Sequence, residues 1–425
     1  MTDSTAMPLT LDLLKGLVAG NVVAIRGRAV LEPAGGPGDK VFPPTHSVDE
    51  RRAATRYAFE QRRINGRDTS CVLLDSVQSQ ANRMEEALQG LWADKRIALP
   101  VITVDFSTCA PDVGVVTSLS APHRIADALL RDSLIDGTLF RLSSIGKSFT
   151  HATPKNAAPL FKVCPTGLVF GIWDSTGPKG GLGSKFARAL VSEIVGIDAT
   201  AGVKTSSRID PASIVTASGP LYIKKHASGE SVTWTLDPKE AEKDGNEPLK
   251  WGSKKSDGKW KLGSGKPSEA NHSNIPPSID TLAGGVTIDH ALHTVVLSLA
   301  ALRKLSFGDG DIEARTALAA LGLLAVLAAE SRGHDLRSRC LLVPQKDAAL
   351  KLQAVYRDGT TKDIALDLEG AITLFNTAVD ALPEAIRFLA NLGVPLASLT
   401  PSPKLADLIT RSRELASVGA DIEEQ

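Results

Sequence analysis

The segment from Ser76 to Trp92 predicts a helix with an unusual polar face. Gln78, Asn82 and Glu85 recur along it at helical spacing. Asn and Ser are weaker helix formers than the Lys and Glu that usually solvate a surface helix. Together with Gln, they make directed hydrogen bonds to phosphate, sugar hydroxyl or backbone groups. The face therefore predicts a nucleic-acid contact, and a solvated face with some capping is the alternative.

A glycine-rich loop, GPKGGLGSK from Gly177 to Lys185, lies between a predicted strand and a predicted helix. Glycines let backbone N–H groups approach an anion, and a helix N-terminus favours negative charge. The loop is not a Walker loop, because Lys185 follows Ser184. It is a poor dinucleotide fingerprint, because Phe186 stands where a glycine is needed. Contact with a nucleic-acid backbone fits better, and a structural turn is the alternative. The basic residues nearby are Lys179, Lys185 and Arg188.

Basic residues are clustered although the chain is neutral overall, with 48 basic and 48 acidic residues. A total charge of zero argues against a protein that coats DNA through an overall positive charge. Contacts to phosphates depend instead on local clusters of basic residues. Residues 51–67 hold six arginines against one acid, Glu60, and residues 250–266 hold six lysines against Asp257. The second cluster is interleaved with tryptophans, which suits base stacking with phosphate neutralisation; hairpins pinned by tryptophan are the alternative. The polar segment that follows, KPSEANHSNIPP, contains Asn271, His272 and Asn274.

Catalytic and metal-binding patterns are weak. The four cysteines are far apart and form no CxxC pair, which excludes a zinc ribbon and fits a reduced cytoplasm. His290 and His293 stand one turn apart on a predicted helix, where a packed or solvated pair is the simpler interpretation. No GxSxG motif, Walker loop or paired carboxylates stand out. We therefore expect no enzyme activity, no cofactor and no metal.

The elements that position these residues alternate between strands and helices, which predicts an α+β or α/β sheet with helices on one face. No signal peptide is visible, and the longest apolar run, Ala317 to Ala329, is too short to cross a bilayer and predicts a buried helix. Predicted strands are Asn21–Leu31, Ser70–Leu74, Leu99–Phe106, Gly167–Trp173, Arg337–Val343 and Leu352–Tyr356. Predicted helices are Leu9–Leu17, Arg51–Arg63, Ser76–Trp92, Pro122–Leu130, Phe186–Val195, Asp289–Leu305, Ile312–Glu330 and Leu368–Leu392.

Several long segments resemble one family when they are taken together. They are DSVQSQANRMEEAL (Asp75–Leu88), APHRIADALLRDS (Ala121–Ser133), GPKGGLGSKFARALVSEIVG (Gly177–Gly196), NHSNIPP (Asn271–Pro277) and GGVTIDHALHTVVLSLAALRKL (Gly284–Leu305). Over roughly residues 15–400, the chain resembles the RAMP-superfamily backbone subunit of type I-G (also called I-U) CRISPR Cascade complexes.

The resemblance implies an α+β fold: an RRM-like (ferredoxin-like) palm with helical elaborations and a hairpin- and loop-rich insertion. It also implies a non-catalytic cytoplasmic subunit that polymerises along the guide RNA (crRNA) and presents it to target DNA in antiviral defence. Expected partners are copies of itself, a large subunit and a guide-processing or cap subunit, with no membrane. A phosphate-binding enzyme that uses the Gly177–Lys185 loop and an RNA-binding protein outside CRISPR remain alternatives.

The expected organisation has four parts. Residues 1–202 begin the palm, with a basic insertion at about 32–67. Residues 203–281 form a lysine-rich insertion and candidate thumb, residues 282–400 complete the palm, and residues 401–425 form an acidic tail. The expected RNA contacts are Arg26, Arg28, Gln78, Gln80, Asn82, Arg83, His123, Arg124, Lys147, Lys179, Lys185, Arg188, Asn271, His272 and Asn274.

Overall fold

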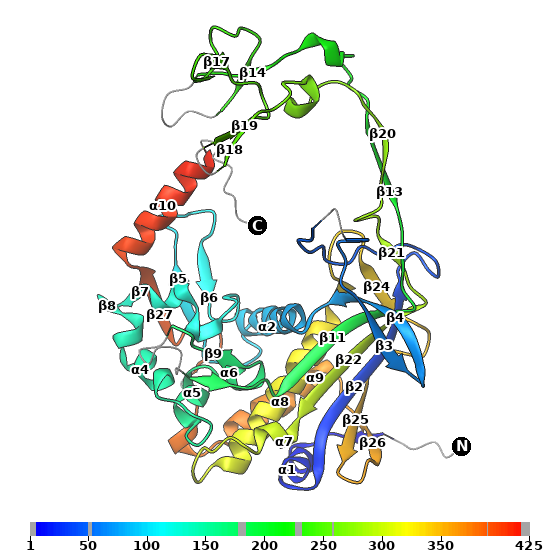
Figure 1. Cartoon of the computed structure of the whole chain (residues 1–425). Helices are drawn as coiled ribbons and strands as arrows, with labels where there is room; N and C mark the ends of the chain where they lie inside the picture. Colours follow the sequence, from blue (N-terminus) through cyan, green and yellow to red (C-terminus); the bar gives the residue numbers. More distant parts are fainter. Residues whose placement is uncertain are drawn as a thin grey trace. The chain divides into compact units, whose positions relative to one another are not determined.

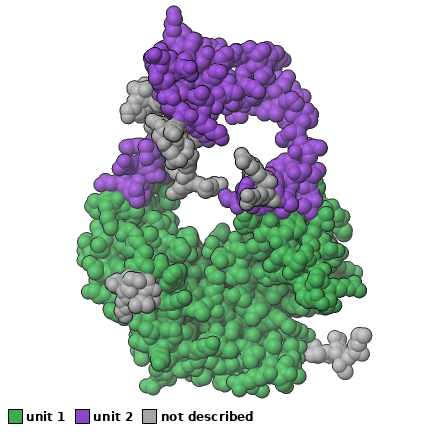
Figure 2. All heavy atoms as spheres, in the orientation of Figure 1, with its two compact units in different colours: residues 1–46, 57–200, 286–406 green, residues 47–56, 201–285, 407–425 purple. Residues whose placement is uncertain are grey.

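The computed structural model describes residues 6–49, 53–176, 184–225, 232–256, 259–388 and 390–417. The chain divides into two compact units, shown in different colours in Figure 2. Unit 1 comprises residues 1–46, 57–200 and 286–406, and unit 2 comprises residues 47–56, 201–285 and 407–425. Helices and strands are mixed in unit 1, so the expected α+β class is confirmed.

A ten-stranded sheet is the centre of unit 1 (Figure 1). Its main path runs β1–β26–β25–β2–β22–β11–β4–β3, and β24 joins β2 and β23 at one end. Every pair is antiparallel except β1 with β26. The bounds are β1 Met7–Pro8, β2 Val22–Pro33, β3 Phe59–Ile64, β4 Arg67–Asp75, β11 Leu190–Ile197, β22 His290–Ser298, β23 His334–Asp335, β24 Leu341–Pro344, β25 Lys351–Tyr356 and β26 Thr361–Ala365.

Four helices of unit 1 pack together beside this sheet, with α8 in contact with the other three. They are α1 (Leu11–Ala19), α2 (Val77–Ala93), α8 (Asp311–Ser331) and α9 (Leu368–Asp380). The predicted buried helix lies in α8, which is long and apolar enough to cross a membrane, but 72% of its apolar window is buried inside the protein. Helix α2 begins after Ser76, whose side chain accepts a hydrogen bond from the Ser79 N–H at 3.2 Å.

A smaller part of unit 1 contains a five-stranded sheet of order β6–β5–β27–β7–β8 and several short helices. Its strands are β5 Ile102–Asp105, β6 Val115–Thr117, β7 Ser133–Ile135, β8 Thr138–Leu139 and β27 Ala397–Pro401. The short helices are α3 Ala128–Arg131, α4 Ser144–Thr150, α5 Ala158–Val163 and α6 Thr166–Val169. The hairpin of β9 (Ile172–Trp173) and β10 (Lys185–Phe186) follows them.

Two predicted helices are strands at the centre of the main sheet. The segment predicted as Phe186–Val195 contains most of β11, and the segment predicted as Asp289–Leu305 contains β22 followed by the single turn α7 (Leu299–Leu302). In β22, burial alternates residue by residue, as one face of a strand requires. β-Branched residues such as Val295 also favour a strand over a helix.

Two further predictions were wrong at shorter elements. The arginine-rich segment predicted as a helix over 51–63 contains most of strand β3, and the predicted strand Gly167–Trp173 begins within α6 (Thr166–Val169) and is a strand only at β9. The segment predicted as the helix Pro122–Leu130 holds a 3₁₀ turn and then α3, and the predicted Leu368–Leu392 helix ends at Asp380.

Unit 2 consists of small antiparallel ladders. The longest pairs β13 (Lys204–Arg208) with β20 (Ile275–Asp280), and three hairpins follow it. Their strands are β14 Tyr222–Ile223 with β15 Trp234–Thr235, β16 Lys243–Asp244 with β17 Glu247–Pro248, and β18 Lys254–Ser256 with β19 Lys259–Lys261. The expected insertion over 203–281 lies within residues 201–285 of this unit. Within the expected acidic tail of residues 401–425, helix α10 occupies Pro403–Ser417, and residues 418–425 lie outside the described residues.

Candidate nucleic-acid interface

A groove of about 560 Å³ in unit 1 gathers residues from three separate stretches of the chain. One wall is a face of α2, the second is the segment 122–124, and the third is the β9–β10 hairpin with the residues after it. Six of the expected RNA contacts line this groove: Gln78, Asn82, His123, Arg124, Lys185 and Arg188. All of them except Arg124 are exposed.

The β9–β10 hairpin adds an aromatic side chain that sequence reasoning missed. Trp173 lines the groove with 57% of its surface exposed. It pairs directly with Lys185 across the hairpin, and the Lys185 Nζ atom lies 5.5 Å from the Trp173 ring centroid. An exposed indole beside a lysine can stack on a base while the ammonium neutralises a phosphate. The sequence pattern indicated base stacking by the tryptophans of the 203–281 insertion instead.

The floor of the groove rests on a buried ion pair. Arg124 Nε and Nη2 donate to the two oxygens of Glu85, each at 2.7 Å, and Nη1 donates to the Gly171 carbonyl at 3.1 Å. Burial raises the pKa of Glu85 to about 7, although Arg124 acts to lower it. Arg124 is therefore committed to joining the 122–124 segment and the Gly171 turn to α2. It positions the groove and contributes no unpaired charge.

Arg188 lies at the rim, and its Nε donates to the Phe170 carbonyl at 3.0 Å. Burial, followed by the charge of Arg124, lowers the pKa of this guanidinium. The turn beneath it depends on Gly171, whose φ is +82°, a conformation that glycine adopts without strain. A Cβ at Gly171 would also lie 2.8 Å from Arg188 Cγ. Because Gly171 has no side chain, Arg188 can pack closely against this turn, and that packing positions Arg188 at the rim of the groove.

Comparison with known protein families gives a match over the part of the chain that contains the groove. Residues 25–201 match the family model described as CRISPR-associated protein GSU0053 (Cas_GSU0053). The match marks a CRISPR-associated protein. It covers less than half of the 425 residues but includes every residue of the groove named above. No curated protein matches the chain.

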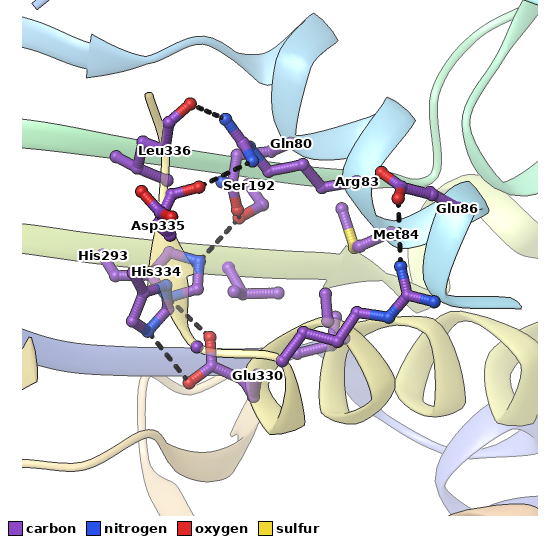
Figure 3. Close-up of a pocket in the computed structure, with 15 residues that line it drawn as sticks. Gln80, Arg83, Met84, Glu86, Ser192, His293, Glu330, His334, Asp335 and Leu336 are labelled. Carbon is purple, nitrogen blue, oxygen red and sulfur yellow. Dashed lines mark hydrogen bonds and ion pairs between the residues drawn. The ribbon is translucent and has the colours of Figure 1, made fainter. Parts of the chain in front are cut away.

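Gln80 and Arg83 of this CRISPR-associated protein line a second cavity, on another face of α2 (Figure 3). Both donate to the buried carboxylate of Asp75, Gln80 through Nε2 at 2.7 Å and Arg83 through Nε at 3.0 Å. Arg83 also donates to the carbonyl of Leu336, and Arg337 Nη2 donates to Asp75 at 3.1 Å. These two predicted RNA contacts therefore serve the internal structure of unit 1.

The remaining predicted contacts are scattered. Arg26 and Arg28 lie on β2, where Arg26 donates to Gln353 at 2.7 Å and Arg28 is exposed, and Lys147 is exposed on α4. Asn271, His272 and Asn274 lie in unit 2, where the Asn274 side chain accepts from the Asp210 N–H at 2.7 Å and the His272 ring packs edge-on at 5.8 Å from Trp234. Lys179 and the glycine loop from 177 to 183 lie outside the described residues.

His290 and His293 do not form the predicted helical pair. They lie on strand β22, three residues apart, and so point to opposite faces of the sheet. His293 instead meets Glu330 and His334, a group whose ligand atoms could hold a metal ion. The spacing of Glu330 and His334, four residues apart across the end of α8, was the available signal. The predicted helix over 289–305 placed His293 on the wrong kind of element, so its approach to Glu330 and His334 was not foreseen.

Proposed function

We propose that this CRISPR-associated protein is a non-catalytic backbone subunit of a type I-G/I-U Cascade complex, and that it holds crRNA in the groove beside Trp173 and Lys185. The observation that carries the proposal is the convergence of five exposed predicted contacts in one groove, above the buried Arg124 that positions them. Exposed amides, a basic residue and an indole suit backbone contact and stacking without base readout.

The order of the central strands supports the RNA-binding part of the proposal. Strands β25–β2–β22–β11 are neighbours in an antiparallel sheet, with α2 between β2 and β11 along the chain and α8 between β22 and β25. This is the β-α-β-β-α-β connectivity of an RRM-like palm, a fold that presents single-stranded RNA to its surroundings. The hairpin β3–β4 is an addition before the first of these helices.

The same proposal defines the partners. Protein contacts to the RNA backbone would leave sequence recognition to base pairing between crRNA and target DNA. Copies of the chain would follow one another along the guide in a head-to-tail filament, together with a large subunit and a guide-processing or cap subunit in the cytoplasm. A neutral total charge suits such stacking, because acidic and basic surfaces of successive copies can face each other.

The test is purification of the chain from cells that also express a CRISPR array and the partner subunits, followed by sequencing of the bound RNA. We expect array-derived crRNA in the wild type. Trp173→Ala should reduce RNA affinity by about 5- to 150-fold, the range for the loss of one stacked base, and Lys185→Ala should also weaken binding through the loss of a phosphate contact. The control Lys346→Ala removes an exposed lysine of unit 1 that does not line the groove, and it should bind like the wild type.

Two results would contradict the proposal. Bound RNA unrelated to the array would place the protein outside guide binding. Equal retention by the groove variants and the control, with unchanged melting temperatures, would show that the groove is not the interface. Nuclease activity that co-purifies with the chain and disappears on a point mutation in it would contradict the non-catalytic part.

A further inference from the structure

Three side chains from three elements converge in the second cavity (Figure 3). His293 comes from the middle of β22, Glu330 from the last turn of α8, and His334 from β23. His293 Nδ1 lies 3.1 Å from one oxygen of Glu330, and His334 Nε2 lies 3.5 Å from the other. One ligand atom from each residue can be chosen so that all lie within 4.8 Å of one another.

A chain of hydrogen bonds determines which ring nitrogen of a neutral His293 carries the proton. The Asp75 carboxylate can only accept, so Gln80 turns its Nε2 toward it and presents Oε1 to Ser192. Ser192 gives its one hydroxyl proton to that oxygen at 2.9 Å, and its own oxygen accepts from His293 Nε2 at 2.8 Å. A neutral His293 therefore carries its proton on Nε2.

The consequence is that the Nδ1 lone pair of a neutral His293 faces the carboxylate of Glu330. The ring is 3% exposed, and Nδ1 makes no hydrogen bond to any residue that the structure describes. Two acceptors held 3.1 Å apart, with one of them buried, repel each other unless a second proton on His293 or a metal cation lies between them. This arrangement is the one expected of ligands around a metal ion.

We propose that His293, Glu330 and His334 bind one divalent transition-metal ion of the Zn²⁺ class. Zn²⁺ takes imidazole nitrogen and carboxylate oxygen at about 2.0–2.2 Å, and a tetrahedral arrangement then places ligand atoms roughly 3.3 Å apart. The separations of 3.1 and 3.5 Å, each to a different oxygen of Glu330, are close to that value, and the three ligand atoms, which lie within 4.8 Å of one another, would draw together around a bound ion. The cavity of about 180 Å³ beside the cluster has room for a water molecule at the fourth position.

Ser192 is the positioning residue of this site. Metal-bound histidines usually donate their second ring N–H to a fixed acceptor, and Ser192 supplies it, held in turn through Gln80 and Asp75. Bound metal would tie the central strand β22 to the end of α8 and to β23 within unit 1. The site is distinct from the groove of the proposed function, since α2 presents Gln80 here and Gln78 there.

The experiment uses the full-length protein, stripped with a chelator and then titrated with Zn²⁺ alone. We expect about one ion per chain, and a rise in the unfolding temperature of roughly 3 °C when Zn²⁺ is about a hundredfold above its Kd. Glu330→Gln and His334→Ala should each lose the bound ion and the rise. The control His290→Ala, on the other face of the same strand and paired with Asp289, should keep both.

Ser192→Ala separates metal binding from folding, because it removes one hydrogen bond and no ligand. We expect about a tenfold weaker Zn²⁺ affinity with unchanged circular dichroism, and Co²⁺ substitution should give the strong visible absorption of a tetrahedral site in wild type. Absence of Zn²⁺ uptake by the wild type would overturn the proposal and leave a protonated His293 paired with Glu330. Equal uptake by the ligand variants and by His290→Ala would also overturn it.

Discussion

Replacing Arg124 by alanine tests the floor of the groove. The change removes two 2.7 Å charge-assisted bonds from Glu85, which is 1% exposed, and leaves its carboxylate without that partner. Breaking a buried pair in this way costs about 3–5 kcal/mol. An exposed pair supplies the control: Arg63 and Asp68 lie 2.9 Å apart at the surface, and Arg63→Ala should cost less than about 1 kcal/mol.

The cost of Arg124→Ala should depend on pH in a defined direction. Burial already raises the folded-state pKa of Glu85 to about 7, and loss of Arg124 raises it further. A carboxyl group with a raised folded pKa contributes stability that is complete below its unfolded pKa and is lost as the pH rises through the folded pKa. In the variant, the free energy of unfolding should therefore fall by up to about 1.4 kcal/mol per pH unit above pH 5.

The assay is urea unfolding of wild type, Arg124→Ala and Arg63→Ala at pH 5.5 and pH 8.0. We expect the gap between wild type and Arg124→Ala to be larger at pH 8.0, while the gap for Arg63→Ala stays small at both. An Arg124→Ala variant within about 1 kcal/mol of wild type at pH 8.0 would refute the reasoning, because the guanidinium would then be dispensable. Equal gaps at the two pH values would refute the assignment of a titrating Glu85.

Three further predictions follow from the structure. Gly171→Ala should destabilise the fold by about 1–3 kcal/mol and weaken RNA binding, since φ is +82° and the new Cβ would meet Arg188; thermal melting and filter binding measure both. Lys185→Ala should reduce the slope of log Kd against log salt by about 0.7, the value for one phosphate of a single strand, and an unchanged slope would exclude a phosphate contact. Deleting residues 248–265 of unit 2 should leave unit 1 folded but reduce assembly on guide RNA, and normal assembly by gel filtration would contradict the assignment of that insertion as the thumb.

Helices α2 and α8 and strand β2 were predicted from the sequence, whereas the central strands β11 and β22 were not. Helix α2 was found because its capping serine and its apolar spacing agree, and α8 because its apolar run is long. β22 was missed because HALHTVVLSLAAL begins as a strand and continues into a helical turn, so its apolar residues satisfy both periods locally. Only the pairing of this segment with β2 on one side and with β11 on the other determines that it is a strand and not a helix.

The sequence predicted only some of the residues that line the groove. Gln78 and Asn82 are visible from the period of α2, but that period cannot tell which polar residues are buried. Gln80 and Arg83 were included with them because nothing local marks Asp75 as a buried carboxylate that needs donors. Trp173 and the Glu330 cluster depend on chain segments that meet only in three dimensions, which one sequence does not reveal.

The insertion of unit 2 between two paired strands has a consequence for how the chain is made. β11 ends at Ile197 and its neighbour β22 begins at His290, so the ribosome must add roughly 90 residues between them, which takes about 5–20 s. Throughout that interval β2 and β11 lack the strand that joins them. The edges of β2 and β11 that will face β22 therefore stay open, a template for wrong pairing, until β22 emerges and pairs with both strands.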